Sequence, residues 1–301
     1  LNMIVKNESH IILSTLKNVL EHINIDYWVI SDTGSTDDTM DIIKDFFKER
    51  GIPGEMFCDE WKDFGHNRTK ALEHAFGKSD YLFIFDADDL IEGNMNLPLI
   101  LDKDCYNIQF ENPASYYRSI LISNKMKWKY IGILHESIVS IDTKKSEEYL
   151  GGDYYILSRR LGNRSKNPDK YLDDAILLEN AYNSETDIGL QARYAFYCAQ
   201  SYKDSGRNEI SIKWYTKVLT LCNWNQEKYY SCMMLGELYR VKKDYINAIK
   251  YWGESYNYDK ERIECIASIM EYYYNIGQHF MVSSLYNKFK HTNVIKKDKL
   301  F

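Results

Sequence analysis

The chain has 301 residues, of which 38 are basic and 44 acidic, and its net charge is −6. This length allows a sizeable core and favours two modest domains, while the mildly acidic balance gives no reason to expect nucleic acid or an anionic membrane as a partner. No apolar run approaches the ~20 residues of a membrane helix. Six scattered cysteines without a CxxC pair argue against a zinc site or disulfide framework and favour a cytoplasmic protein with reduced thiols.

Short apolar runs alternate with helical patterns over the first ~150 residues, which is typical of an α/β sheet. We expect strands at 2–7, 26–32 and 80–89, and the last is apolar enough to be a central strand covered on both faces. Helices are predicted at 10–23, 36–50 and 67–76, and the glycines and proline of residues 51–54 end the second of them. Further strands, some of them antiparallel, are predicted over "CYNIQF", "YYRSILI" and "SIVSI".

Strand signals stop at about Arg164, and three helical stretches then align with one another. Tyrosines at 202, 239 and 273 are each followed four residues later by a turn centre and twelve residues later by an apolar residue. The turn centres are Gly206, Lys243 and Gly277, and the apolar residues are Trp214, Tyr251 and Leu285. The spacings of 37 and 34 residues resemble the tetratricopeptide helix-turn-helix unit; a plain helical bundle is the alternative. The predicted domains are 1–160 and 161–301.

Two acidic clusters follow strands that the pattern predicts to be buried. Asp32 ends the second strand, and Asp86-Ala87-Asp88-Asp89 ends the strand at 80–89. Ligands of open α/β sheets bind beyond the carboxyl ends of the strands. Carboxylates gathered there repel one another unless a cation or hydrogen-bond donors lie among them, and oxygen ligands of this kind suit Mg²⁺ or Mn²⁺.

The motifs "MIVKNES", "ISDTGSTDDT", "WKDFGHNR", "FDADD" and "WKYIGILHES" occur in this order, and with them residues 1 to 160 resemble family 2 glycosyltransferases of the GT-A fold. The helical tail is more loosely similar to a subgroup with tetratricopeptide-like helices, as in bacterial S-glycosyltransferases that modify peptides. The resemblance implies an α/β GT-A domain (Rossmann-like, with a mixed sheet) followed by an all-α domain.

The resemblance also implies a donor site for a UDP-sugar. Asp32 would hydrogen-bond the uracil, and the backbone near Val5 would line the same base pocket. Arg68 would lie beside the base and the phosphates, and Asp86 would contact the ribose. Asp88 would bind the Mn²⁺ or Mg²⁺ ion that bridges the diphosphate, which stabilises the negative charge of the departing UDP.

For the transfer itself, the family's catalytic carboxylate corresponds to Glu136, which would deprotonate the acceptor. His135 beside it would be a further metal ligand. Relatives often carry another histidine after the last strand, but residues 154–166 contain none. The basic residues of that segment would close over the diphosphate instead: Arg159, Arg160, Arg164 and Lys166.

Several of these residues have purely structural alternatives. Asp32 would then be a turn residue, Arg68 would pair with Asp32, and Glu136 would form a structural salt bridge. Part of the motif after the second strand is explained by helix formation alone. Ser35 or Thr36 would cap the following helix, and Asp37 and Asp38 would lie in its first turn, where acidic residues are favoured.

We therefore predict a metal-dependent, inverting hexosyltransferase that uses a UDP-sugar, with a protein or peptide as the preferred acceptor. The helical repeats would either present that acceptor or mediate self-association. A glycan or lipid-linked acceptor is an alternative, as is a repeat scaffold with an inactive transferase domain, although the acidic motifs are intact. A nucleotidyltransferase is less favoured because "NMIVKNES" lacks a glycine-rich basic loop.

Overall fold

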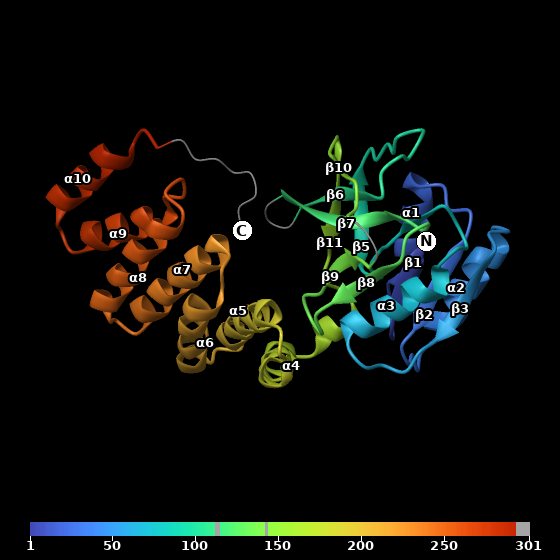
Figure 1. Cartoon of the computed structure of the whole chain (residues 1–301), viewed down its shortest axis with the longest axis horizontal. Helices are drawn as coiled ribbons and strands as arrows, with labels where there is room; N and C mark the ends of the chain where they lie inside the picture. Colours follow the sequence, from blue (N-terminus) through green and yellow to red (C-terminus); the bar gives the residue numbers. More distant parts are fainter. Residues whose placement is uncertain (112–114, 142–143, 293–301) are drawn as a thin grey trace. The chain divides into compact units, whose positions relative to one another are not determined.

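The computed structural model describes residues 1–111, 115–141 and 144–292. The chain divides into two compact units, Leu1–Pro168 and Asp169–Phe301. The first unit contains all the strands of the described chain and the second contains only helices (Figure 1). The predicted order, an α/β domain with a mixed sheet followed by an all-α domain, is thereby confirmed. In the described part of the chain, no helix combines the length and hydropathy needed to span a membrane.

The first unit is built mainly from strands. In chain order these are β1 (Asn2–Val5), β2 (Trp28–Asp32), β3 (Gly54–Cys58), β4 (Tyr81–Phe83), β5 (Asp89–Gly93), β6 (Cys105–Glu111), β7 (Ser115–Ser123), β8 (Trp128–Ile131), β9 (Ser137–Ser140), β10 (Glu147–Leu150) and β11 (Tyr154–Ser158). The helices are α1 (Ile12–His22), α2 (Thr39–Glu49), α3 (Phe64–Ala75) and the short 3-10 helix η1 (Asn163–Lys166).

Two sheets meet along the β1–β4 line and act as one platform. Strands β1, β2 and β3 are parallel neighbours in that order, and the larger sheet runs β4-β7-β6-β11-β5 with β10 beside β6. A parallel bridge between Asn2 and Ile84 joins them, so β4 lies between β1 and β7, which confirms a central strand at this place. The strand is shorter than the predicted 80–89, since β4 covers only Tyr81–Phe83 and Asp89 begins β5. Antiparallel β6–β7 pairing beside parallel β6–β11 pairing confirms the partly antiparallel character.

Amphipathic helices pack on this platform because their apolar side chains repeat at helical spacing. In α1 the buried face comprises Ile12, Leu16 and Val19, all 0% exposed. Strand β2 is buried at every position, as expected for a parallel strand covered on both faces. Strand β3 was not predicted: its segment "GEMFC" is mostly half-buried and lacks β-branched residues.

The start of α2 differs from the prediction. The helix begins at Thr39 rather than Thr36, and its N-cap residue makes no side-chain capping bond. The proposed cap by Ser35 or Thr36 is therefore wrong. The Ser35 hydroxyl instead accepts a hydrogen bond from the Asn7 backbone amide at 2.9 Å, and the Asn7 side chain accepts one from the Thr36 amide at 2.7 Å. These residues fasten the loop after β1 to the loop after β2.

Strand β5 ends the larger sheet, and its outer edge is covered by α1. The Asn18 side chain accepts a hydrogen bond from the Ile91 amide at 2.7 Å and donates one to the Ile91 carbonyl at 2.9 Å. Two residues further along β5, a ring nitrogen of His22 lies 3.1 Å from the Gly93 carbonyl oxygen. Side chains of the helix thus stand in for a further strand.

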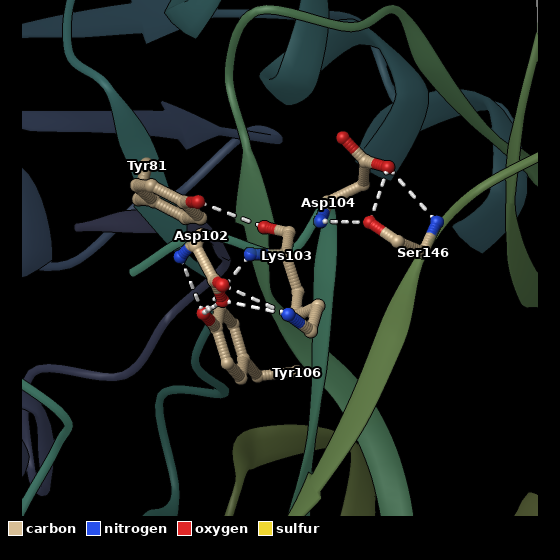
Figure 2. Close-up of polar contacts among 6 residues, drawn as sticks. All are labelled: Tyr81, Asp102, Lys103, Asp104, Tyr106 and Ser146. Atoms are coloured by element: carbon tan, nitrogen blue, oxygen red, sulfur yellow. Dashed lines mark hydrogen bonds and ion pairs between the residues drawn. The ribbon is translucent and has the colours of Figure 1, made fainter. Parts of the chain in front are cut away.

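The entry to β6 is fixed by polar contacts, shown in Figure 2. The Tyr106 hydroxyl accepts hydrogen bonds from the backbone amides of Asp102 and Lys103 at 2.8 and 3.1 Å. Asp104 accepts hydrogen bonds from the amide and hydroxyl of Ser146 at 2.8 and 2.6 Å, which brings β10 alongside β6. All six side chains in this view bond to one another or to nearby backbone, so the cluster serves the fold.

The second unit is a series of antiparallel helices. These are α4 (Lys170–Ser184), α5 (Ile188–Asp204), α6 (Asn208–Leu221), α7 (Asn225–Val241), α8 (Tyr245–Tyr258), α9 (Glu264–Asn275) and α10 (His279–Phe289). The three predicted turn centres are confirmed, since Gly206, Lys243 and Gly277 have φ of 77°, 62° and 74°. Three equivalent backbone bonds close the turns, from 207 to 202, 244 to 239 and 278 to 273, at 2.8, 2.9 and 2.8 Å. The hairpins therefore repeat in structure as well as in sequence.

Candidate active site

The loop after β2 places Asp32 against the end of β1. The parallel register pairs Asp32 with Val5, so these two predicted nucleotide residues lie side by side. The carboxylate atom Oδ1 of Asp32 accepts hydrogen bonds from the backbone amides of Gly34 and Ser35 at 2.9 and 2.8 Å, and Gly34 has a φ of 101° that suits glycine. The other oxygen, Oδ2, is buried and has no hydrogen-bond partner among the described residues. A buried acceptor left in this way costs about 1–3 kcal/mol, so a ligand N–H group would stabilise it.

The acidic turn after β4 carries Asp86, which is held by two arginines. Its Oδ1 lies 2.6 Å from Nη2 of Arg68, and its Oδ2 lies 3.5 Å from Nη1 of Arg118. Burial disfavours ionisation here, but the two guanidinium groups outweigh burial and hold the pKa of Asp86 well below its usual range. Burial, reinforced by Asp86 and Asp88, raises the pKa of the neighbouring Asp89 to about 8. The turn therefore carries less uncompensated charge than its three carboxyl groups suggest.

Glu136 reaches this cluster from the hairpin formed by β8 and β9. Its Oε1 lies 2.6 Å from Nε of Arg68, and both side chains are only 10% exposed. The alternative pairing of Arg68 with Asp32 is not observed, whereas the salt bridge considered for Glu136 is present. His135 precedes Glu136 in the same loop, is exposed and has a φ of 54°.

Asp88 lies on the other side of the turn, beneath the segment that follows β11. Its Oδ2 accepts a hydrogen bond from the Gly162 amide at 2.9 Å. The next amide, that of Asn163, lies 3.1 Å from a carboxylate oxygen of Glu8 in the loop after β1. Two consecutive backbone amides thus hold two carboxylates, and the pKa of Glu8 is raised by burial, with Asp88 adding to the effect and the Asn163 amide opposing it.

The four basic residues predicted to close over the diphosphate have different surroundings. Arg159 serves the fold, since its Nε donates to the Asp88 carbonyl oxygen at 2.9 Å and its Nη2 to the Thr15 hydroxyl at 2.9 Å. Arg160 has a φ of 55°. Arg164 and Lys166 are exposed on η1, where the Arg164 guanidinium carbon lies 5.0 Å from the centre of the Phe64 ring.

The ligands available for a divalent ion are few. No group of three or more His, Cys, Asp or Glu side chains in the ranges that the structure describes could hold a metal ion. An Mg²⁺ or Mn²⁺ ion that is shared with substrate phosphates needs only one or two protein carboxylates. Asp88 fits that second kind of site, because its contacts to the chain in the described ranges engage only Oδ2. The geometry does not fit an ion that is held by protein side chains alone.

Sequence reasoning missed Arg118 and Glu8. Arg118 stands within the apolar run "YYRSILI" of β7, and a charged residue in such a strand signals a charged partner. Glu8 belongs to the motif "MIVKNES", but only the folded chain shows that it lies near Asp88. In both cases the partner, Asp86 for Arg118 and Asp88 for Glu8, lies far away in the sequence.

Comparisons with known proteins give matches to glycosyltransferases. The model of the family described as glycosyl transferase family 2 matches residues 2–107. The SPbeta prophage-derived glycosyltransferase SunS of Bacillus subtilis (strain 168) is 39% identical over 89 residues, which is 29% of this chain and 19% of that protein. Glycosyltransferase SunS of Bacillus phage SPbeta gives the same values. The match thus spans about a fifth of the length of these relatives.

Among solved structures, the chain is similar to S. aureus TarS residues 1–349, with a TM-score of 0.38, 12% identity and coverage of 85% of this chain and 89% of that one. The same protein in complex with UDP gives a TM-score of 0.34. The family match contains the acidic turn, Asp32 and Arg68. Over residues 2–107 this chain is therefore similar to glycosyltransferase family 2.

Proposed function

We propose that this chain is an inverting glycosyltransferase that moves a sugar from a UDP-sugar to a protein or peptide acceptor with the help of Mn²⁺ or Mg²⁺. The observation that carries the proposal is the buried, unpartnered Oδ2 of Asp32 at the strand ends of a domain similar to family 2 glycosyltransferases. The uracil ring offers an N–H group to such an oxygen. In the proposed complex this bond replaces an unsatisfied acceptor with a charge-assisted hydrogen bond.

Charge balance in the acidic turn supports separate roles for its carboxylates. Asp86 is already neutralised by Arg68 and Arg118, so it suits the uncharged ribose hydroxyls. The Asp88 carboxylate accepts one hydrogen bond, from the Gly162 amide, and forms no ion pair in the described contacts, so it would hold the divalent ion together with the diphosphate. When bound, that ion stabilises the charge that develops on the departing UDP. Arg164 and Lys166, exposed on η1, would add positive charge near the phosphates.

Glu136 is the proposed general base. The acceptor nucleophile forms a bond to the anomeric carbon while the bond from that carbon to the diphosphate oxygen breaks. Glu136 takes the proton of the nucleophile in the same step, and attack from the face opposite the leaving group inverts the anomeric configuration. The ion pair with Arg68 holds Glu136 beside the acidic turn.

The helical unit supports the choice of a protein or peptide acceptor. It exposes large apolar side chains around the turns of its last two hairpins, and these suit a polypeptide better than a soluble sugar: Tyr245 at 39%, Ile246 at 84%, Tyr274 at 62% and Phe280 at 80% exposure. Replacing Ile246 and Phe280 by aspartate should impair transfer to the acceptor without changing UDP affinity.

The donor site is tested by calorimetric titration of UDP with and without Mn²⁺. Asp32→Asn puts an N–H donor where an acceptor is required and should weaken UDP binding at least about tenfold. Asp88→Asn should abolish the Mn²⁺ dependence of binding. Asp80→Asn is a matched control, because the Asp80 side chain is 85% exposed, and it should bind as wild type does. Absence of UDP binding to the wild-type protein would overturn the proposal.

A further inference from the structure

Arg68 joins two carboxylates that have different proposed roles. Its Nη2 lies 2.6 Å from Asp86, and its Nε lies 2.6 Å from Glu136. The Arg68 side chain is only 10% exposed, and its guanidinium carbon also lies 5.7 Å from the centre of the Tyr130 ring. The contact with Asp86 is a hydrogen bond, whereas the contact with Glu136 is an ion pair in which Nε forms no hydrogen bond in the described structure. One rigid, planar group thus lies against both carboxylates and keeps the acidic turn close to Glu136.

The backbones of α3 and of the β8–β9 hairpin pack closely against each other around Arg68. The Phe64 amide at the start of α3 donates to the Ile133 carbonyl at 3.1 Å, and the Tyr130 amide donates to the Thr69 hydroxyl at 2.9 Å. Between these two bonds, a Cβ atom added to Gly65 would lie 2.1 Å from the Gly132 carbonyl oxygen. Helix α3 and the β8–β9 hairpin are therefore held in one register, and Arg68 spans them at the position of Glu136.

We propose that Arg68 is a positioning residue, which orients the base Glu136 against the donor-side carboxylate Asp86 and does not itself bind the nucleotide. This inference rests on the proposed function, because it takes Glu136 as the base. It replaces the sequence-based expectation that Arg68 lies beside the base and phosphates. The guanidinium sides that carry Nε and Nη2 already face carboxylates, and burial restricts access of a ligand to the rest.

Lysine is the informative substitution at this position. It keeps the positive charge, but it is a point donor on a flexible stem and cannot hold two carboxylates at a fixed separation. If Arg68 acted through charge alone, Arg68→Lys would rescue the function that Arg68→Gln loses. If Arg68 positions Glu136, the two variants should behave alike.

The experiment compares Arg68→Lys and Arg68→Gln with Glu136→Gln, which removes the other end of the same link. Lys70→Gln is the control on α3, since Lys70 is exposed and pairs only with Glu73 in the described contacts. UDP affinity is measured by calorimetry, kcat and KM are measured for hydrolysis of UDP-glucose and UDP-N-acetylglucosamine, and amide hydrogen exchange is followed in residues 131–137.

We expect Arg68→Lys to leave UDP affinity and KM within about threefold of wild type while kcat falls about 100-fold, as for a misplaced catalytic group. Exchange in the 131–137 loop should rise in both Arg68 variants and in Glu136→Gln. A double variant with Arg68→Lys and Glu136→Gln should have a kcat no lower than that of Glu136→Gln alone. The effects of two substitutions on kcat are not additive when the two residues act as a unit.

A tenfold loss of UDP affinity in Arg68→Lys with unchanged exchange in the loop would make Arg68 a nucleotide ligand and overturn the inference. Wild-type kcat in Arg68→Lys would overturn it as well. If the wild-type protein binds no UDP, the proposed function fails. The exchange measurement then still decides whether Arg68 fixes Glu136, because it needs no ligand.

Discussion

Asp37 links the loop after β1 to the start of α2. It accepts hydrogen bonds from the amides of Ser9 and Thr39, both at 3.1 Å. Although burial opposes ionisation, these bonds and those of the side chains lower the pKa of Asp37 from 3.8 to about 2. Its negative form thus stabilises the folded state, by about 1 kcal/mol once solvent screening is allowed for.

This contribution should disappear in acid. Because the folded pKa is lower than the unfolded one, the stabilisation is present above about pH 4 and is lost as pH falls towards 2. Urea unfolding should show Asp37→Asn to be about 1 kcal/mol less stable than wild type at pH 6, with a smaller gap at pH 3. Asp38→Asn is the comparison, because Asp38 makes no side-chain capping bond. A gap that stays constant with pH would contradict this account.

Gly65 is the residue most sensitive to added volume near the site. A Cβ there would meet the Gly132 carbonyl oxygen at 2.1 Å, and backbone of a paired hairpin cannot yield cheaply. Gly65→Ala should cost about 1–3 kcal/mol of unfolding free energy and lower kcat, because it pushes the Glu136 loop away from α3. In contrast, Gly152→Ala meets its nearest atoms at 3.4 Å and should stay near wild type in both measurements.

At the scale of elements, the three helical hairpins invite a comparison of their turns. Glycine occupies the left-handed position in two of them, and Lys243 occupies it in the third with a φ of 62°. A side chain in this conformation costs about 1 kcal/mol. Lys243→Gly should therefore stabilise the helical unit by up to about 1 kcal/mol in thermal or urea unfolding.

The neighbouring residue provides the control for that substitution. Lys242 has right-handed helical geometry with a φ of −74°, so Lys242→Gly gains nothing from glycine and loses helix propensity. It should destabilise the same unit by about 0.5–1 kcal/mol. Equal effects of the two substitutions would show that backbone strain at residue 243 is absent.

Element positions could be read from the sequence where the signal was local. The apolar residues within 80–89 predicted a central strand, and the repeated spacing from tyrosine to turn predicted all three turn centres. Strand β3 escaped detection because it is short and only half-buried. The start of α2 was misplaced because Ser35 and Thr36 bond to Asn7, a contact between two loops that no local propensity contains.

At the scale of the whole molecule, two compact units imply two unfolding events. Each unit has its own buried core, so a single unfolding free energy does not describe the chain. UDP should raise only the transition of the first unit, by about 2.7 kcal/mol at one hundred times its Kd. Calorimetry should show Gly65→Ala lowering that transition and Lys243→Gly raising the other. A single transition moved by both variants would contradict this expectation.

Some residues of the candidate site can be recognised in the sequence, whereas the contacts between them depend on the folded chain. Strand-end carboxylates such as Asp32 and Asp86 are visible in a single chain because strand, turn and acid are adjacent. The partners of Arg68 are not, since Asp86 and Glu136 lie 18 and 68 positions further along the chain. Only the register between α3 and the β8–β9 hairpin brings them together, and that register depends on backbone contacts at Gly65.

The covering of β5 by Asn18 and His22 bears on how the protein behaves in a crowded solution. A bare strand at the end of a sheet recruits strands from other molecules, and such recruitment starts polymerisation. Here the outward amide and carbonyl of Ile91 are both already bonded to Asn18. Growth of intermolecular sheet from that edge would first require α1 to come away from the larger sheet, so two helix side chains protect the edge against pairing with another molecule.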